Sequence, residues 1–125
     1  MKVIVCDKNL KEYFSSFLKE LKGVQIDEVK VEIYEDVDCG GSERKKIINI
    51  YSFAATPKGM GYGRKAMEEI CRLADKYGIS LSLYPTDKSE FYRKFGFKYI
   101  LKGYPPSDMF RLQEEHITDR IVFVE

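Results

Sequence analysis

The stretch Lys58-Gly59-Met60-Gly61-Tyr62-Gly63-Arg64 places three glycines between an apolar segment, residues 46–54, and an amphipathic one, residues 63–77. The first segment is predicted to be a strand, and the second a helix that Gly78 ends. A glycine-rich loop that opens a helix presents unpaired N–H groups at the positive end of the helix dipole. Glycines also let the backbone approach a ligand closely. The stretch is therefore predicted to bind phosphate oxygens.

Several other interpretations of the glycine loop have to be compared. A phosphate-binding P-loop needs G-x-x-x-x-G-K-[S/T], and no register of the glycines supplies it. Residues 61–66 fit the dinucleotide pattern G-x-G-x-x-[G/A], with Asp87 at the distance of a ribose ligand. That motif belongs to the first strand–helix unit of its fold, whereas here a helix and strands precede it. A tight turn without any ligand remains open.

Length and composition predict one ordinary globular domain, residues 1–125. The chain has 44% hydrophobic and 33% charged residues and a net charge of +1. A near-neutral balance gives no reason to expect nucleic acid or a membrane surface as a partner. The N-terminal apolar run is too short for a signal peptide, and no apolar stretch approaches 18 residues. We therefore expect a cytoplasmic protein.

The reactive residue types argue against a metal centre. Cys6, Cys39 and Cys71 form no C-x-x-C pair, so we expect reduced thiols rather than disulfides or zinc ligands. His116 is the single histidine, which excludes a multi-histidine metal site. It is interpreted as a surface or packing residue, with a Ser-His-Asp triad as the alternative.

The remaining pattern predicts strands and helices that alternate irregularly. Residues 10–21 carry apolar side chains on one helical face and are predicted to form a helix. The helix is expected to start at a capping box, Asn9 to Glu12, and to end at Gly23. Further helix is predicted at 88–95. Strands are predicted at 3–6 (buried), 29–34 (half-buried), 79–84, 97–101, 109–112 and 121–124. Residues 38–42 are predicted to form a turn between the strands 29–34 and 46–54. Residues 103–107 are predicted to form another turn. This order implies an α/β fold with a mixed sheet.

Two motifs together resemble the GNAT superfamily of N-acetyltransferases. The pyrophosphate loop of that family reads [Gln/Arg]-x-x-Gly-x-[Gly/Ala], and residues 58–63 fill it with lysine in first place. Downstream, Phe91-Tyr92-Arg93-Lys94-Phe95-Gly96-Phe97-Lys98 is similar to the family's FYxKxGF segment. The resemblance covers residues 45–112 well. It is poorer before residue 45, where the family has two helices and an additional strand.

The resemblance implies a GNAT-like acyltransferase fold, with a mainly antiparallel sheet flanked by helices, and direct attack of a primary amine on acetyl-CoA. Tyr92 matches the family tyrosine whose hydroxyl lies near the thioester sulfur, so Tyr92 is expected to protonate the leaving thiolate. The family's usual strand glutamate is missing, so Glu32, Glu35 or bulk solvent is left as the base. Arg64 and Lys65 are either phosphate ligands or solvated cations. The resemblance assigns cofactor contacts to Phe53, Ala54, Ala55, Lys58, Gly59, Met60, Gly61, Tyr62, Gly63 and Arg64.

Two alternatives to an enzyme remain at this point. One is a non-catalytic GNAT-like domain that binds a CoA ester or a protein partner. The other is a small structural or interaction protein whose loop holds nothing. For an enzyme, the acceptor is an amine on a small molecule or a protein. A homodimer is possible if the strand 120–124 joins a partner's sheet rather than its own.

Overall fold

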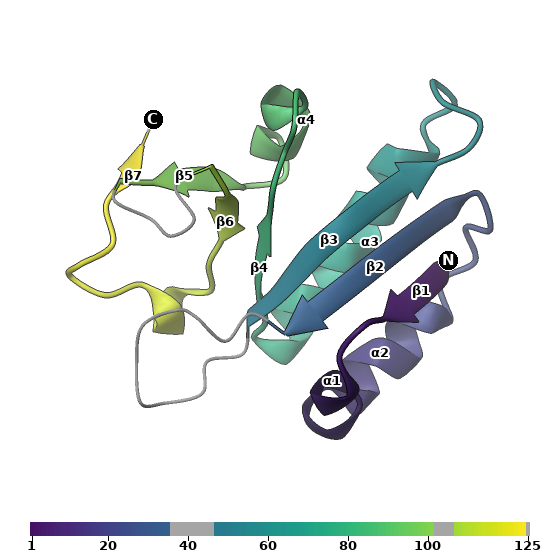
Figure 1. Ribbon diagram of the computed structural model, residues 1–125, viewed down its shortest axis with the longest axis horizontal. Helices are drawn as coiled ribbons and strands as arrows, with labels where there is room; N and C mark the ends of the chain where they lie inside the picture. The colour runs from purple at the N-terminus through teal and green to yellow at the C-terminus, as the bar shows by residue number, and fades with distance from the viewer. Residues whose placement is uncertain (36–46, 102–106, 125) are drawn as a thin grey trace.

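The computed structural model describes residues 1–35, 47–101 and 107–124, shown as ribbons in Figure 1. Cys39, the turn predicted at 38–42 and most of the turn predicted at 103–107 lie outside these residues. The described elements in chain order are β1 (Lys2–Val5), α1 (Lys8–Tyr13), α2 (Ser15–Lys22), β2 (Val29–Glu35), β3 (Ile47–Ala55), α3 (Tyr62–Tyr77), β4 (Ser80–Leu83), α4 (Ser89–Arg93), β5 (Lys98–Ile100), β6 (Met109–Arg111), the 3-10 turn η1 (Glu114–His116) and β7 (Phe123–Val124).

The described strands form one sheet in the order β1-β2-β3-β4-β6-β5-β7. The pairs β1–β2 and β3–β4 are parallel, and the four other pairs among these strands are antiparallel. The predicted fold class, α/β with a mixed and mainly antiparallel sheet, is confirmed. The C-terminal strand β7 pairs with β5 of its own sheet.

The core lies between one face of this sheet and the helices. Val29, Val31 and Ile33 of β2 point into it with 1–2% exposure, so the predicted alternation is confirmed. Helix α3 runs behind β2 and β3 in Figure 1. Its buried side chains form one broad stripe, made by Ala66, Met67, Ile70, Cys71, Leu73 and Ala74. No helix in the described ranges is long and apolar enough to cross a bilayer.

The N-terminal strand and helix differ from expectation in three respects. β1 is an edge strand and only half-buried, whereas burial was predicted. The predicted single helix is broken at Phe14 into α1 and α2. The helix cap is Asp7, whose carboxylate accepts from the Asn9 N–H at 2.9 Å, rather than a box starting at Asn9. Periodicity cannot reveal the break, because the buried positions keep helical spacing across it.

Strand β4 is buried on both faces, although serine and leucine alternate along it. The serines are tolerated inside because their hydroxyls have partners. Asn49 Nδ2 donates to Ser82 Oγ at 3.0 Å, and the Gln113 N–H donates to Ser80 Oγ at 2.8 Å. Both partners lie 33 residues away along the chain, so the local pattern could not show them.

His116 packs against the same strand. Its Nδ1 lies 2.5 Å from Ser80 Oγ, which gives a serine–histidine contact. Ser80 is 0% exposed, however, and a nucleophile must be reached by its substrate. The triad alternative is therefore wrong, and His116 is a packing residue that holds η1 against β4.

Arg111 on β6 ties the C-terminal end of α3 to the sheet. Its guanidinium binds the Asp75 carboxylate in a two-bond fork, at 2.7 and 3.0 Å. Its Nε donates to the Phe95 carbonyl at 2.8 Å, and Gln113 Nε2 donates to Asp75 Oδ1 at 2.8 Å. The hydrogen bond from Arg111 holds the pKa of the Asp75 carboxyl below its usual range. The ionised form is therefore stabilised by folding.

We expect Asp75→Asn to lower the free energy of unfolding at pH 7 by about 1 kcal/mol, since the carboxylate is more than half exposed and partly screened. A lowered pKa gives stability that is present above the ordinary carboxyl pKa and lost as pH falls through the lowered value. The difference in the free energy of unfolding between Asp75→Asn and the natural chain should therefore shrink as pH falls below about 4.

Urea unfolding at several pH values measures the free energy of unfolding of the variant and of the natural chain. Glu68→Gln, which removes an exposed helical ion pair with Arg64, is the matched control and should cost less than about 0.5 kcal/mol. Equal losses in the two variants, or a gap that does not depend on pH, would contradict the expectation.

Candidate functional site

The parallel strands β3 and β4 separate in the middle of β3. Their last paired residues are Ile50 and Leu83, after which β3 continues through five residues to Ala55. Pro85 soon follows β4 and has no N–H to give to a ladder. On its other side β3 stays paired with β2 as far as Ala55. One edge of β3 from Tyr51 to Ala55 is therefore left without a partner strand among the described residues.

The predicted cofactor residues Phe53, Ala54 and Ala55 lie on this open edge. Phe53 and Ala55 are partly buried and pack against the core, while Ala54 is exposed. The structure thus brings the three together where an extended ligand can reach backbone groups. Whether they bind a cofactor stays a prediction.

A β-bulge marks the point of separation, and sequence reasoning missed it. Glu32 pairs with Ser52 and Ile33 with Ile50, so Tyr51 is the additional residue on β3. The Tyr51 side chain is 68% exposed and packs edge-to-face on Tyr34 with ring centroids 5.4 Å apart. One signal could have located the bulge: inward-facing apolar residues change phase, from 48 and 50 to 53 and 55.

The glycine loop then leads from β3 to α3. Gly59 and Gly61 have φ of +81° and +80°, a conformation that side chains disfavour, although a Cβ at either would meet open space. Gly63 does not need a positive φ, because it lies within the helix. A Cβ added there would lie 3.6 Å from the Phe53 ring. Two of the three glycines are therefore required by backbone conformation.

The N-terminus of α3 is open to solvent. Gly61 caps the helix without a side-chain hydrogen bond, and the Lys65 N–H is bonded to the Gly61 carbonyl at 3.1 Å. The N–H groups of residues 62–64 precede that bond and face out of the helix end. Lys58 and Met60 are exposed on the loop, while Arg64 is exposed and pairs with Glu68 at 3.2 Å. This end of the helix can therefore bind an anion. The charge of Arg64 there is already partly neutralised by Glu68.

Tyr92 lies on α4 in an aromatic cluster. Its ring is 7% exposed and packs against Phe91 and Phe97 with centroids 5.1 and 5.7 Å away. Burial raises the pKa of its hydroxyl. Phe97 is fully buried as predicted, whereas Phe91 and Phe95 are only partly buried.

A cavity of about 530 Å³ opens at the separation of the strands. It is lined by Asn49, Ile50, Tyr51, Ser52, Tyr84, Thr86 and Asp108. Tyr92 is not among these residues. Asp108 is only 9% exposed and brings a carboxylate that sequence reasoning missed. No motif surrounds Asp108, so its position became apparent only when β6 paired with β4.

The two glutamates considered as bases do not line this cavity. Glu32 forms an ion pair with Lys30 at 3.4 Å, and Glu35 is buried opposite Ile48. Among the described residues, no group of three histidines, cysteines or carboxylates could hold a metal ion.

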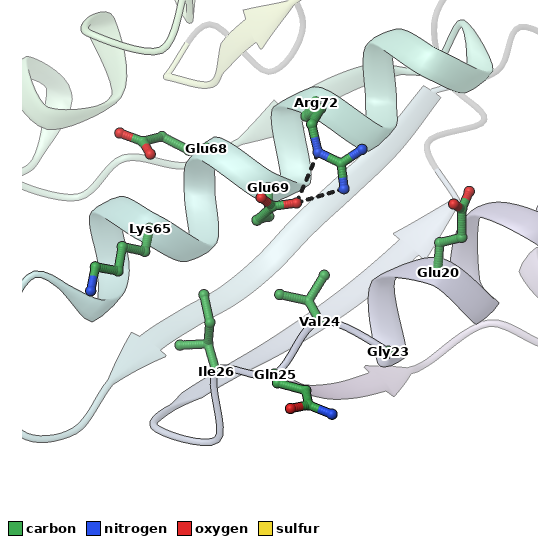
Figure 2. A pocket seen from close by; sticks show the side chains of 9 residues that line it. All are labelled: Glu20, Gly23, Val24, Gln25, Ile26, Lys65, Glu68, Glu69 and Arg72. Atoms are coloured by element: carbon green, nitrogen blue, oxygen red, sulfur yellow. Dashed lines mark hydrogen bonds and ion pairs between the residues drawn. The ribbon is translucent and has the colours of Figure 1, made fainter.

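A second groove, of about 540 Å³, lies between the end of α2 and α3 (Figure 2). Its charged side chains largely satisfy one another. Arg72 binds Glu69 through two hydrogen bonds, and Glu20 receives hydrogen bonds from Lys76 and Tyr77. This groove is formed by residues distant in sequence from the point where β3 and β4 separate. Nothing in its lining indicates a ligand.

Comparisons with known proteins give little further guidance. No family model and no curated protein matches the chain. Among solved structures, the AtaT Y144F mutant toxin bound to the C-terminus of the antitoxin AtaR and acetyl-CoA is similar, at 16% identity and a TM-score of 0.41. The same complex described without acetyl-CoA gives 16% and 0.40. Each match covers 70% of this chain and 59% or 58% of the other. Similarities of this size decide neither family nor function.

The glycine geometry makes a testable pair of substitutions. Gly61→Ala should lower the free energy of unfolding by about 1 kcal/mol, because alanine at φ +80° is strained. Gly63→Ala should be neutral or stabilising by up to about 0.5 kcal/mol, because alanine favours the helix and its Cβ meets ordinary contacts. Urea unfolding of both variants tests this, and equal effects would contradict the backbone argument.

Proposed function

We propose that this chain is a short GNAT-type N-acetyltransferase that transfers an acetyl group from acetyl-CoA to a primary amine. The observation that carries the proposal is the open edge of β3 beside the glycine loop and the start of α3. The open strand edge, the glycine loop and the cavity at the strand separation all adjoin the second half of β3. Ligands of open α/β sheets commonly bind at strand ends.

The pyrophosphate, the pantetheine arm and the thioester of acetyl-CoA can each be matched with a feature of the chain. The pyrophosphate would accept hydrogen bonds from the N–H groups of residues 59–64 at the positive end of α3. The pantetheine arm carries amides, and it would pair with the unpartnered edge of Phe53, Ala54 and Ala55 as an added strand does. The thioester would then reach the bulge at Tyr51, next to the cavity.

The chemistry needs little beyond positioning. A neutral amine attacks the thioester carbon, the tetrahedral intermediate expels the thiolate, and the nitrogen passes its surplus proton to solvent. Tyr92 is proposed to protonate the thiolate. Its raised pKa keeps the phenol protonated at neutral pH, which is the state a proton donor needs.

A non-catalytic domain that binds a CoA ester or a protein partner is the second candidate. The observation that favours it is the absence of Tyr92 from the cavity lining. Binding and turnover must therefore be measured separately.

Calorimetric titration with acetyl-CoA tests the binding half. We expect a saturable interaction that Arg64→Glu weakens about tenfold, because it reverses a charge at the anion-binding end of α3. Arg72→Glu, two turns further along the same helix, is the control and should change affinity less than about twofold. If neither acetyl-CoA nor CoA binds at millimolar concentration, the acetyltransferase and the domain that binds a CoA ester are both wrong.

Thiol release over a panel of amines tests the catalytic half. Tyr92→Phe keeps the buried ring and should lower kcat at least tenfold with acetyl-CoA affinity unchanged. Tyr99→Phe on β5 is the control and should keep kcat. Because burial raises the pKa of Tyr92, its deprotonation should reduce kcat only above about pH 10. Unchanged turnover in Tyr92→Phe removes this role, and no release with any amine favours the non-catalytic candidate.

A further inference from the structure

Strand β7 ends the sheet on the side away from β1 (Figure 1). The Leu101 N–H donates to the Val122 carbonyl at 2.7 Å, and Tyr99 pairs with Val124. Bonded and non-bonded positions alternate along an antiparallel ladder, so the N–H and the carbonyl of Phe123 point away from β5. In the described part of the chain no other strand lies along this edge. The backbone of Phe123 is therefore open to an added strand.

This edge lacks the features that usually protect an edge strand. Residues 121–124 are Ile-Val-Phe-Val, without a charge or a proline. Leu101 lies opposite Val122, and Val124 follows two residues later, so the three side chains share one face of the sheet. They are 55%, 51% and 38% exposed. Single exposed aliphatic side chains are ordinary on a protein surface, but three together beside an open strand edge indicate a binding surface.

Two cations flank this apolar stretch, and neither has a carboxylate partner among the described residues. Lys98 Nζ lies 5.2 Å from the centre of the Phe123 ring, over the edge strand itself. The ring face attracts the ammonium group and keeps it at the edge. Arg120 is exposed just before β7, next to the exposed Asp119. These two cations and one carboxylate leave the described part of the edge with a net positive charge.

The charge of the edge distinguishes between its possible occupants. A second copy of the chain, paired through β7 about Phe123, would bring its own Lys98 to the same face, where like charges repel. A lipid surface cannot give the strand-type main-chain hydrogen bonds that Phe123 is placed to make. An extended peptide with carboxylates beside an apolar centre supplies both the hydrogen bonds and the opposite charge.

We propose that the open edge of β7 binds an extended, acidic segment of another protein as an added strand. Phe123 makes the main-chain hydrogen bonds, the exposed aliphatic side chains beside it pack on apolar residues of the segment, and Lys98 and Arg120 pair with its carboxylates. Strands β4, β6 and β5 separate β7 from β3 in the sheet. The assignment is therefore independent of acetyl-CoA and of the proposed function.

Three heptapeptides, each capped at both ends, serve as probes. One is the acidic Glu-Glu-Ile-Val-Ile-Glu-Glu, and the second is the basic Lys-Lys-Ile-Val-Ile-Lys-Lys. The third is the acidic peptide with its three central residues N-methylated, so that its centre cannot donate main-chain hydrogen bonds. Each peptide is titrated into ¹⁵N-labelled protein at pH 7 while the backbone amide shifts are followed.

The acidic peptide should shift the amides of Leu101, Val122, Phe123 and Val124. It should bind about tenfold more tightly than the basic or the N-methylated peptide, because these lose the opposite charge or the main-chain hydrogen bonds. Equal binding by either of the other peptides would overturn the proposal. So would shifts confined to residues elsewhere, or no saturable response to the acidic peptide at millimolar concentration.

Lys98→Glu should remove the preference for the acidic peptide, because it reverses the charge over the edge strand. Lys2→Glu is the matched control, an exposed lysine on the strand at the other end of the sheet, and should keep the preference. If Lys98→Glu disturbs the fold, Arg120→Glu reverses an exposed charge outside the strands and should also reduce the preference. An unaltered preference in a folded variant contradicts the assignment.

The other occupants are separate outcomes of the same experiments. A dimer of the peptide-free chain with the Phe123 amide protected from hydrogen exchange would assign the edge to a second copy. Shifts of the edge amides with phosphatidylserine vesicles, but not with the acidic peptide, would assign it to a membrane. Either result overturns the proposal.

The labelled sample also separates this inference from the proposed function. Acetyl-CoA should shift the amides of residues 59–64 and leave the response to the acidic peptide unchanged. Peptide binding without acetyl-CoA binding would reject the acetyltransferase and leave the edge assignment standing. Acetyl-CoA binding with no response to the peptide would overturn the edge assignment alone.

Discussion

The parallel pairing of β3 with β4 ends at Ile50 and Leu83, and the candidate site depends on that end. β3 remains part of the sheet beyond it because β2 continues to pair with it as far as Ala55. β4 cannot follow, because its chain turns away at Pro85. The result is a strand that is rigid on one edge and open on the other. A longer β4 would have satisfied that edge and closed the cavity.

The two ends of α3 have different surroundings. At the C-terminal end, Asp75 is bound by Arg111, and Lys76 and Tyr77 contact Glu20 on α2. Gly78 ends the helix in the left-handed conformation. At the N-terminal end the first N–H groups have no side-chain cap. Tight packing at one end therefore fixes the direction in which the positive end of the helix points, toward the glycine loop.

Much of the element order could be read from periodicity. The stripe on α3, the alternation in β2 and the terminators Gly23 and Gly78 are local patterns, and local patterns report which face of an element is apolar. The break at Phe14 and the full burial of β4 were not visible. The break leaves the helical spacing of the buried positions unchanged. The burial of β4 depends on partners far along the chain, such as Gln113 for Ser80, that replace water around polar groups.

The sequence by itself determined the glycine loop, because only glycine takes positive φ without strain, and a helix must start where the amphipathic stripe begins. It also placed Tyr92 on a short helix after β4. The tertiary structure alone decided the row that Tyr51 forms with Tyr84 and Asp108, whereas the change of phase along β3 already marks the bulge. Strand register is set by packing across the whole sheet, so residues 57 positions apart become neighbours without any mark in the local sequence.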